Sequence, residues 1–479
     1  VATDRTYKNH PFQKSTYNQN EHAFCILNSG ADYIDGRNSY LTFDLHNFTT
    51  PSIGGITYDQ LSSNESPEFF RLGSVIDLIA GITITDRAGN EVERIRDVGR
   101  IANMLMRSTY SPSWFATYGK LLGARPSAGT DFTVSPYSGD WDAGIFPNSD
   151  NKADFGLVGT EDTEVEGVPR SFVVPLRFLS GIFDYDQLLP AHLMSGLRIE
   201  LEFQEKYRSL KFPGRNDIYR FEIRNARCVL DSVKLTDSIS RELNERAANN
   251  GLEIPFRTWW TTSYVGSSTD KTNVEVRKAV SRAFGAVAHV APKPPARAPD
   301  AFNPDPNETD AYNFKSWQWR AGNLYFPHQQ LSNNRSDKQT EGGITAQQDH
   351  SFTSGAAQTY LHYQRLFGKN HEKFSENDMN PRFYQYEKSG YDEEKSGWNK
   401  GSSANQTDNT FVHAVPYYGL IPLDLERSCV QDLSGIPLNN SRVLALNYEL
   451  ETAAENVVTI WMQHLKVARV FMDNTEIEE

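Results

Sequence analysis

The most constraining feature of this sequence is a set of strand-like segments that recurs in the same order in both halves. Residues 172–176 (FVVPL) resemble residues 419–423 (GLIPL), and the two prolines are 247 positions apart. At the same offset, residues 197–203 (LRIELEF) match residues 444–450 (LALNYEL) in the same phase of alternation. Ordered self-similarity of this kind indicates a duplicated structural unit. We therefore expect two related domains of about 240 residues each.

Alternation of apolar and polar residues dominates the chain and predicts strands. The alternating segments are residues 24–27, 41–45, 82–84, 197–203, 219–235, 258–265, 279–290, 443–450 and 457–472. Among them, Phe221 and Ile223 match Ile460 and Met462 at an offset of 239, which extends the repeat. Many strands with few helices between them are typical of sandwiches and barrels. The expected fold class is all-β, with two tandem eight-stranded jelly-roll barrels, a few short helices and long loops.

Three segments have the apolar spacing of amphipathic helices, at residues 91–106, 237–248 and 354–367. The second of these begins at Asp237, an N-cap candidate, and stops just before Gly251 near the middle of the chain. We expect it to connect two domains. The predicted organisation is an N-terminal arm at 1–22, a first jelly roll at 23–236, a helical connector at 237–251 and a second jelly roll at 252–479.

The segments between these elements are long and polar. Residues 123–169, 292–310, 332–350 and 369–409 are rich in Gly, Ser, Asp, Asn or Pro and are expected to be loops, the second and fourth on an outer face. At the start of the chain, residues 1–19 contain three aromatic residues but almost no aliphatic ones. We expect this arm to be mobile in an isolated subunit, because it has little apolar surface to bury.

Charge and cysteine content exclude several classes of protein. The chain of 479 residues has 48 Lys and Arg against 61 Asp and Glu, a net charge of −13, which disfavours direct genome binding. No apolar run approaches the ~20 residues of a membrane-spanning helix, and no secretory signal is visible at the start. Cys25, Cys228 and Cys429 are far apart and odd in number, so we predict neither a disulfide framework nor a zinc site.

No residue pattern predicts an enzyme or a cofactor. Asp184 and Asp186 are two carboxylates near one another, but in a turn they are more typical of solvated capping residues than of a glycosidase pair. Asn148, Asp150 and Asp154 have the alternate spacing of a calcium loop, yet a lysine occupies one ligand position and no glutamate closes the set. The histidines, His362 and His371 among them, show no metal-binding spacing. We therefore expect no catalytic, cofactor-binding or metal-binding residues.

Several segments together resemble a known family. They are residues 38–45 (NSYLTFDL), 73–79 (GSVIDLI), 89–95 (GNEVERI), and the series that runs from 174–176 (VPL) through 188–190 (LLP) to 197–201 (LRIEL). They resemble the double jelly-roll major capsid proteins of the adenovirus–tectivirus lineage, most closely those of Polinton-like viruses and virophages. The resemblance spans most of the first half and the last ~60 residues, and residues 300–409 match nothing in the family.

The resemblance implies a structural protein of the virion, synthesised and assembled inside the host cell. It implies a homotrimer that forms a pseudo-hexagonal, hexon-like capsomer of an icosahedral DNA virus shell. The implied partners are neighbouring capsomers, penton and minor capsid proteins and, as a further candidate, an internal membrane. Under this reading, the N-terminal arm is expected to clamp neighbouring capsomers on the inner side, ahead of membrane contact and genome contact.

A second reading stays open at the level of sequence. A two-domain β-sandwich that binds carbohydrate, or a glycoside hydrolase, is favoured by acidic loops and by aromatic residues such as Trp317, Trp319 and Tyr325. The absence of a well-placed acid/base pair counts against it. Oligomeric mass separates the two readings, since only the capsid reading requires a trimer.

Overall fold

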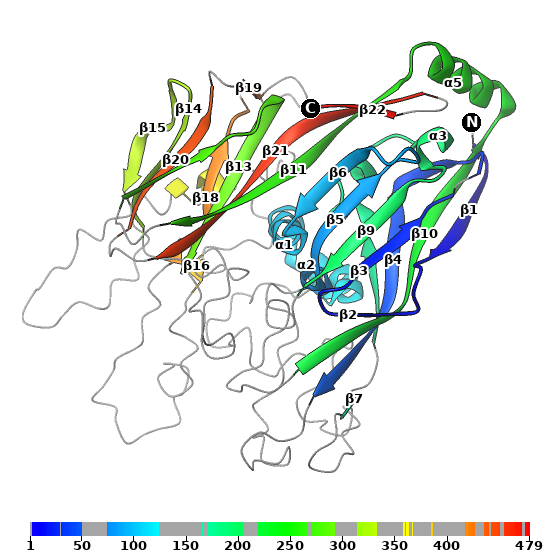
Figure 1. Ribbon diagram of the computed structural model, residues 1–479, viewed down its shortest axis with the longest axis horizontal. Helices are drawn as coiled ribbons and strands as arrows, with labels where there is room; N and C mark the ends of the chain where they lie inside the picture. Colours follow the sequence, from blue (N-terminus) through cyan, green and yellow to red (C-terminus); the bar gives the residue numbers. More distant parts are fainter. Residues whose placement is uncertain are drawn as a thin grey trace, which may run out of the picture.

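The computed structural model describes most of the strand-forming parts of the chain. The described residues are 2–28, 30–49, 74–123, 165–166, 170–204, 219–266, 271–292, 314–332, 358–359, 361–363, 366, 385–386, 417–418, 420–426, 435–439, 442–450, 455–471 and 475–479. Strands dominate these ranges and the helices are short (Figure 1), which confirms the expected all-β class. The expected loops lie almost entirely outside the described residues.

The first half of the chain forms two antiparallel sheets layered face to face (Figure 1). One sheet has the order β1 (Ala2–Pro11), β10 (Tyr219–Leu235), β4 (Tyr33–Thr49) and β7 (Val165–Glu166), with β2 (Thr16–Asn18) paired to β10 and β8 (Arg170–Pro175) paired to β4. The other has the order β3 (His22–Ile26), β9 (Arg198–Phe203), β5 (Ile79–Thr85) and β6 (Glu91–Arg96).

The second half repeats this arrangement. Its larger sheet has the order β11 (Leu252–Gly266), β21 (Asn456–Val470), β13 (Val280–Pro292) and β18 (Leu420–Asp424), with β19 (Ile436–Leu438) paired to β13 and β22 (Thr475–Glu478) paired to β21. Its smaller sheet has the order β12 (Lys271–Val276), β20 (Leu444–Leu450), β14 (Phe314–Ala321) and β15 (Leu324–Ser332). A short ribbon pairs β16 (Gln385–Tyr386) with β17 (Tyr417–Tyr418).

The helical elements lie mainly in the first half. They are η2 (Val75–Leu78), α1 (Val98–Thr109), α2 (Pro112–Thr117), η3 (Tyr118–Leu122), η5 (Leu176–Phe178), η6 (Ile182–Asp184), α3 (Ala191–Met194) and α5 (Asp237–Asn249). Of the predicted helix at 354–367, the described residues 358–359, 361–363 and 366 are helical. Within it, Tyr363 is buried and its hydroxyl lies 3.4 Å from that of Ser108 at the end of α1.

The predicted duplication is visible as a shared topology. The order β3-β9-β5-β6 returns as β12-β20-β14-β15, and β10-β4-β8 returns as β21-β13-β18. The two proline-containing segments, 172–176 and 419–423, lie largely in β8 and β18. Pro175 pairs with Tyr40, and Pro422 pairs with Val287. β8 thus lies beside β4 in the first half, just as β18 lies beside the equivalent strand β13 in the second half.

The offset predicted for the last pair of matching strands is wrong by several residues. Leu41 on β4 pairs with Cys228, whereas its counterpart Ala288 on β13 pairs with Ile460. Cys228, and not Phe221, therefore corresponds to Ile460. Both Cys228 and Phe221 are buried, and the pairing of β10 with β4 shifts register between them, so alternation alone could not fix the match.

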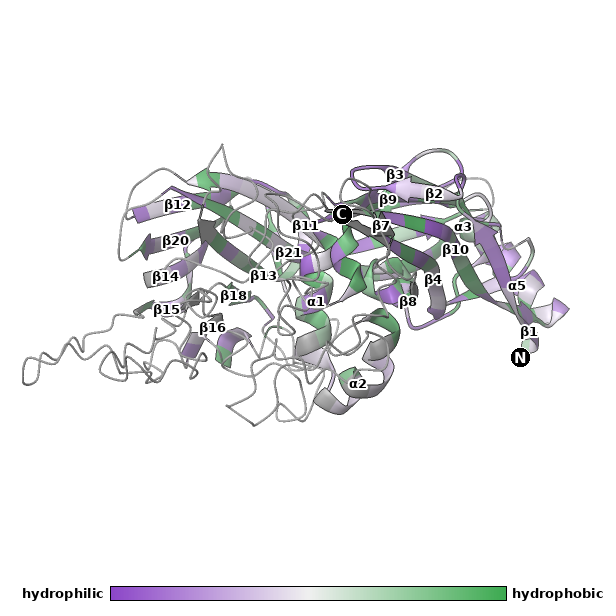
Figure 2. Ribbon diagram, turned by 90° about the horizontal axis from the view of Figure 1, so that it is seen from below, coloured by the Kyte–Doolittle hydropathy of each residue, from purple (hydrophilic) through white to green (hydrophobic). Residues whose placement is uncertain are grey.

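The helix predicted at 237–248 is confirmed as α5 (Asp237–Asn249). Thr236, not Asp237, occupies its N-cap position, and Gly251 just beyond its end has a φ of +74°, which suits glycine. The strand before α5 and the strand after it belong to different sheets. The helix is largely hydrophilic and lies at the far end of the first half, beside β1 (Figures 1 and 2).

The expectation that residues 1–19 form a mobile arm is wrong for residues 2–18. β1 pairs with β10 along its length, and Phe12 and Tyr17 are buried in the core. The Arg5 guanidinium binds the buried carboxylate of Asp231, and its Nη2 also donates to Asp35 Oδ2 at 2.9 Å. Aromatic rings supply the buried area that a count of aliphatic residues misses.

The helix predicted at 91–106 is correct only in its second part. Residues 91–96 form β6, which pairs back to β5 across the turn at residues 86–90. Asp97 then takes a left-handed backbone conformation, with φ of 51°, and α1 begins at Val98. Val92, Ile95 and Val98 fit a helical spacing, but the hairpin turn just before them places the first six residues in a sheet.

Two tyrosines of the N-terminal segment provide a direct test of its role. Tyr17 is 1% exposed, so Tyr17→Ala should lower the unfolding free energy by about 3–5 kcal/mol through lost burial and a cavity. Tyr7 is 61% exposed, and Tyr7→Ala should change it by no more than about 0.5 kcal/mol. Urea denaturation followed by circular dichroism measures both. Equal and small effects would show that the segment is dispensable for the fold.

Candidate functional site at the junction of the two halves

The carboxylates singled out in the sequence are not arranged as a reaction centre. The Asp184 side chain is 56% exposed and forms an ion pair with Arg37, whose Nε lies 3.2 Å from Oδ1. Asp186 is also exposed. Asn148, Asp150, Asp154 and His371 lie outside the described residues, and His362 is partnered within the fold.

Metal-binding clusters and membrane-spanning helices are both absent from the described residues. In this part of the chain, no group of three or more His, Cys, Asp or Glu side chains is placed to hold a metal ion. No helix among the same residues is long and apolar enough to cross a membrane.

A set of buried polar contacts lies where the two halves meet. Strand β11 of the second half runs past β6 of the first half (Figure 1) and also contacts η6. A Cβ atom on Gly181 would lie only 1.8 Å from the carbonyl oxygen of Arg257, so the two backbones touch. The Thr261 hydroxyl donates to the carbonyl oxygen of Arg96 at 2.9 Å. The junction is therefore made by backbone as well as by side chains.

Glu93 on β6 is a fully buried carboxylate beside this contact. Its oxygens accept hydrogen bonds from the Ser180 hydroxyl, from the Gly181 amide at 2.9 Å and from the Ile182 amide at 3.4 Å. Burial raises the pKa of Glu93 above the ordinary value of a glutamate, and these hydrogen bonds oppose the rise. The carboxylate fixes the Gly181 backbone in the position where it meets Arg257.

A buried arginine makes a second link across the junction. Arg100 on α1 donates from Nη1 to Nδ1 of His289 on β13, at 3.1 Å. An arginine nitrogen can only donate, so Nδ1 of His289 accepts and its ring proton lies on Nε2. The Arg100 guanidinium also lies 5.0 Å from the ring centroid of Trp461 on β21, in a cation–π contact. All three residues are almost completely buried.

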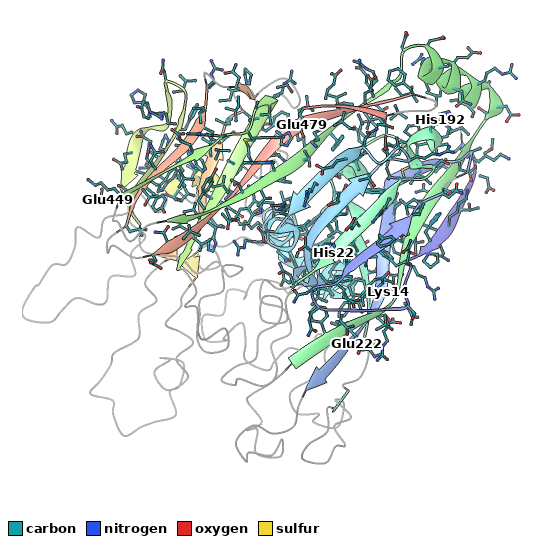
Figure 3. The ribbon with its side chains drawn as sticks, viewed as in Figure 1. Lys14, His22, His192, Glu222, Glu449 and Glu479 are labelled. Carbon is teal, nitrogen blue, oxygen red and sulfur yellow. The ribbon has the colours of Figure 1, made fainter. Side chains whose placement is uncertain are left out.

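Lys466 on β21 forms a third link. Its ammonium lies 2.7 Å from Glu479 Oε1 and 3.5 Å from the carbonyl oxygen of Val92 on β6. Lys278 also binds Glu479, whose position beside β22 is shown in Figure 3. Burial alone would raise the pKa of Glu479, but the two lysines lower it to about 2. Nearby, burial lowers the pKa of His464 to about 4.

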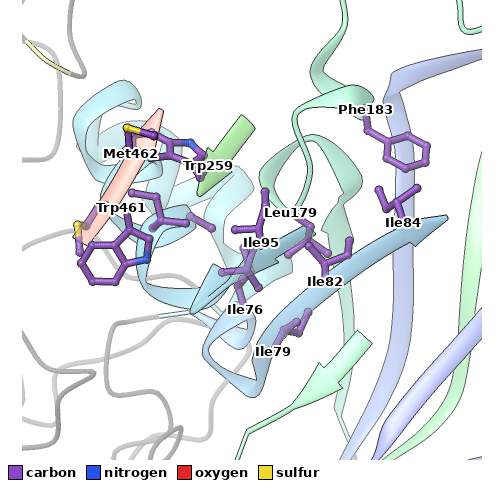
Figure 4. Packing of buried hydrophobic residues seen from close by; sticks show 14 of the residues in the cluster. Ile76, Ile79, Ile82, Ile84, Ile95, Leu179, Phe183, Trp259, Trp461 and Met462 are labelled. Atoms are coloured by element: carbon purple, nitrogen blue, oxygen red, sulfur yellow. The ribbon is translucent and has the colours of Figure 1, made fainter. Parts of the chain in front are cut away.

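Apolar packing surrounds these polar links. A single hydrophobic cluster includes residues from both halves. Figure 4 shows Trp259, Trp461 and Met462 of the second half beside the isoleucines of η2, β5 and β6. Glu93, Arg100 and Lys466 each have polar partners at the junction. The arrangement is suited to holding the two halves in one fixed orientation, and sequence reasoning missed it because its charged residues look like ordinary surface residues.

Comparison with known proteins identifies the fold. No protein-family model and no curated protein sequence matches the chain. A structure of the Sputnik virophage matches with a TM-score of 0.60 at 11% identity, over 100% of this chain and 88% of that one. The Faustovirus major capsid protein matches with a TM-score of 0.54 at 9% identity, over 98% of this chain and 91% of that one. The mavirus major capsid protein matches with a TM-score of 0.52 at 10% identity, over 99% and 90%. The predicted resemblance to double jelly-roll major capsid proteins is thus confirmed at the level of the fold.

Gly181 allows a steric test of the junction. Its φ of −69° suits any residue, so Gly181→Ala mainly adds the clash with Arg257 and should cost more than about 2 kcal/mol. Gly89→Ala is the contrasting control, since nothing lies within 4 Å and only its φ of +88° costs about 1–2 kcal/mol. In urea denaturation, Gly181→Ala should also separate the unfolding of the two halves into distinct transitions. A single unshifted transition would contradict the proposed contact.

Glu93 provides a test by pH. The pKa of Glu93 in the folded protein lies above its unfolded value of about 4.3. Between these two pKa values the native state binds more protons than the unfolded state, so stability falls as the pH rises. Glu93→Gln removes this titration. The unfolding free energy of the wild type minus that of Glu93→Gln should therefore fall between pH 4 and pH 7, as measured by urea denaturation at each pH. Glu91→Gln, at an exposed position on the same strand, is the matched control. A difference that stays constant with pH would contradict the burial effect.

Proposed function

We propose that this chain is the major capsid protein of an icosahedral DNA virus and has a structural, non-enzymatic role in the virion. The observation that supports this most strongly is the duplicated four-sheet fold, which matches viral capsid structures over almost the whole of both chains. A fold alone does not define a function, but this one comes with a junction specialised for rigidity. Fixed relative placement of two barrels is what a shell-building subunit requires.

The duplication explains how such a subunit fills a shell. Two jelly rolls per chain and three chains per capsomer place six similar units around one axis, so a homotrimer can occupy a position with six neighbours. Contacts to neighbouring capsomers, penton proteins and minor capsid proteins then come from the sides of the jelly rolls and their loops. An internal membrane is a further candidate partner on the inner side.

The domain division follows the chain connectivity. In this proposal the first jelly roll ends at residue 236, residues 237–251 connect the two units, and the second jelly roll comprises residues 252–479. The change of sheet between β10 and β11 supports this division. Because residues 2–18 belong to the first sheet, the proposed subunit uses its N-terminal segment for its own fold rather than as a clamp between capsomers.

The carbohydrate-binding alternative loses its main support. Trp317 and Trp319 are 1% and 0% exposed, and they lie in the core of the second half. Rings buried in this way cannot stack on a sugar. Of the three aromatic residues that favoured this reading, Tyr325 is the exposed one.

The oligomeric mass tests the proposal. Size-exclusion chromatography with light scattering should give about 160 kDa, three times the 54.2 kDa of one chain. Electron micrographs of the same fraction should show particles with a hexagonal outline. A monomer that gains thermal stability in the presence of oligosaccharides would overturn the proposal and restore the alternative.

A further inference from the structure

Two cysteines that are far apart in the sequence meet inside the first half. Cys25 lies on β3 and Cys228 on β10, which belong to the two facing sheets, and both side chains are fully buried. The Cys25 thiol donates to the carbonyl oxygen of His10 at 3.4 Å. His10 is in turn the residue of β1 that pairs with Cys228. The Cys25 thiol therefore lies beside the backbone position that pairs with Cys228, and both thiols are free.

We propose that Cys25 and Cys228 form a disulfide that links the two sheets of the first jelly roll when the protein meets a small disulfide oxidant such as oxidised glutathione. The inference does not depend on the capsid function. It rests on the placement of both thiols at one corner of the fold, where the chain passes from β1 through β2 to β3. A pair brought together by two different sheets is positioned to be oxidised within one chain.

The thiol–disulfide exchange with oxidised glutathione proceeds in two steps. The Cys25 thiolate attacks one sulfur of oxidised glutathione, forming a mixed disulfide and releasing one glutathione. The Cys228 thiol then loses its proton and attacks Cys25 Sγ, which forms the protein disulfide and releases the second glutathione. Two electrons pass from the protein thiols to the oxidant, and the two thiol protons end on the two released glutathiones.

The environment assigns the order of the two steps. The neighbouring Cys228 thiol lowers the pKa of the Cys25 thiol, although burial acts in the opposite direction. The same contact, together with burial, raises the pKa of Cys228 well above its ordinary value. Cys25 is therefore the thiol that ionises first and attacks the oxidant, and Cys228 resolves the intermediate.

Access to the buried pair requires a local opening. β1 is an edge strand whose side chains are mostly exposed, so the corner at His10 can separate at lower cost than the interior strands. We expect oxidation to be slow in buffer and faster in urea well below the unfolding transition. Once formed, the disulfide closes a loop of about 200 residues and should stabilise the fold.

The test uses the full chain with Cys429→Ser, so that only the two cysteines of interest remain. The reduced protein is incubated with oxidised glutathione, in buffer and in sub-denaturing urea, and then analysed by intact mass and by non-reducing peptide mapping. The expected result is loss of two hydrogens, a peptide that links Cys25 to Cys228, and a higher urea midpoint that dithiothreitol reverses. The matched control, Cys25→Ser in the same background, should form no internal link.

Three outcomes would overturn the inference. The first is a protein that stays unmodified in both conditions, which would show that the thiols cannot react even when the corner opens. The second is a stable adduct with glutathione on Cys25 that Cys228 fails to resolve, which would show that the sulfurs do not meet. The third is a disulfide between two chains, which would show that an exposed thiol reacts with another molecule before the internal pair can form.

Discussion

The pairing of β11 with β21 is the constraint on which the rest of the structure depends. Fifteen residues on each strand pair without a register shift, from Leu252 with Val470 to Gly266 with Asn456. At roughly 3.3 Å per residue, this ribbon is about 50 Å long. The whole ribbon belongs to the larger sheet of the second half, and its strand β11 also runs along β6 and η6 of the first half. The contacts of Arg257, Thr261 and Lys466 with the first half are all made from this ribbon.

Buried charge at the junction has an energetic meaning. Glu93, Arg100 and Lys466 each lose hydration, which costs several kcal/mol for an isolated ion. Each is engaged by groups in fixed directions: backbone amides and a hydroxyl for Glu93, an imidazole and an indole ring for Arg100, and a carboxylate for Lys466. Apolar residues could supply similar stability but would allow one half to slide over the other. Directional contacts favour one orientation of the two halves over others that bury a similar area.

Much of the fold followed from local patterns, whereas the junction did not. Alternation predicted the strands, and the caps around 237–251 predicted α5, because both signals depend on neighbours in sequence. The role of residues 2–18 could not be read in this way, because Tyr17 and Phe12 find their partners in a strand that follows some 200 residues later. Glu93 and Lys466 carry charges that predict solvent exposure, and only the packing of one half on the other reveals their burial. Gly181 gave no signal, since its importance lies in a distance to Arg257.

A ribbon of one half that packs along the other also resists bending between the two halves. Flexing the subunit would require the continuous hydrogen-bond ladder of β11 and β21 to twist, or Gly181 to part from Arg257. In a shell of the proposed kind, this junction makes each subunit behave as a stiff tile. The curvature of the particle would then have to come from the contacts between subunits. Such a subunit favours large, nearly flat facets that meet at sharp edges.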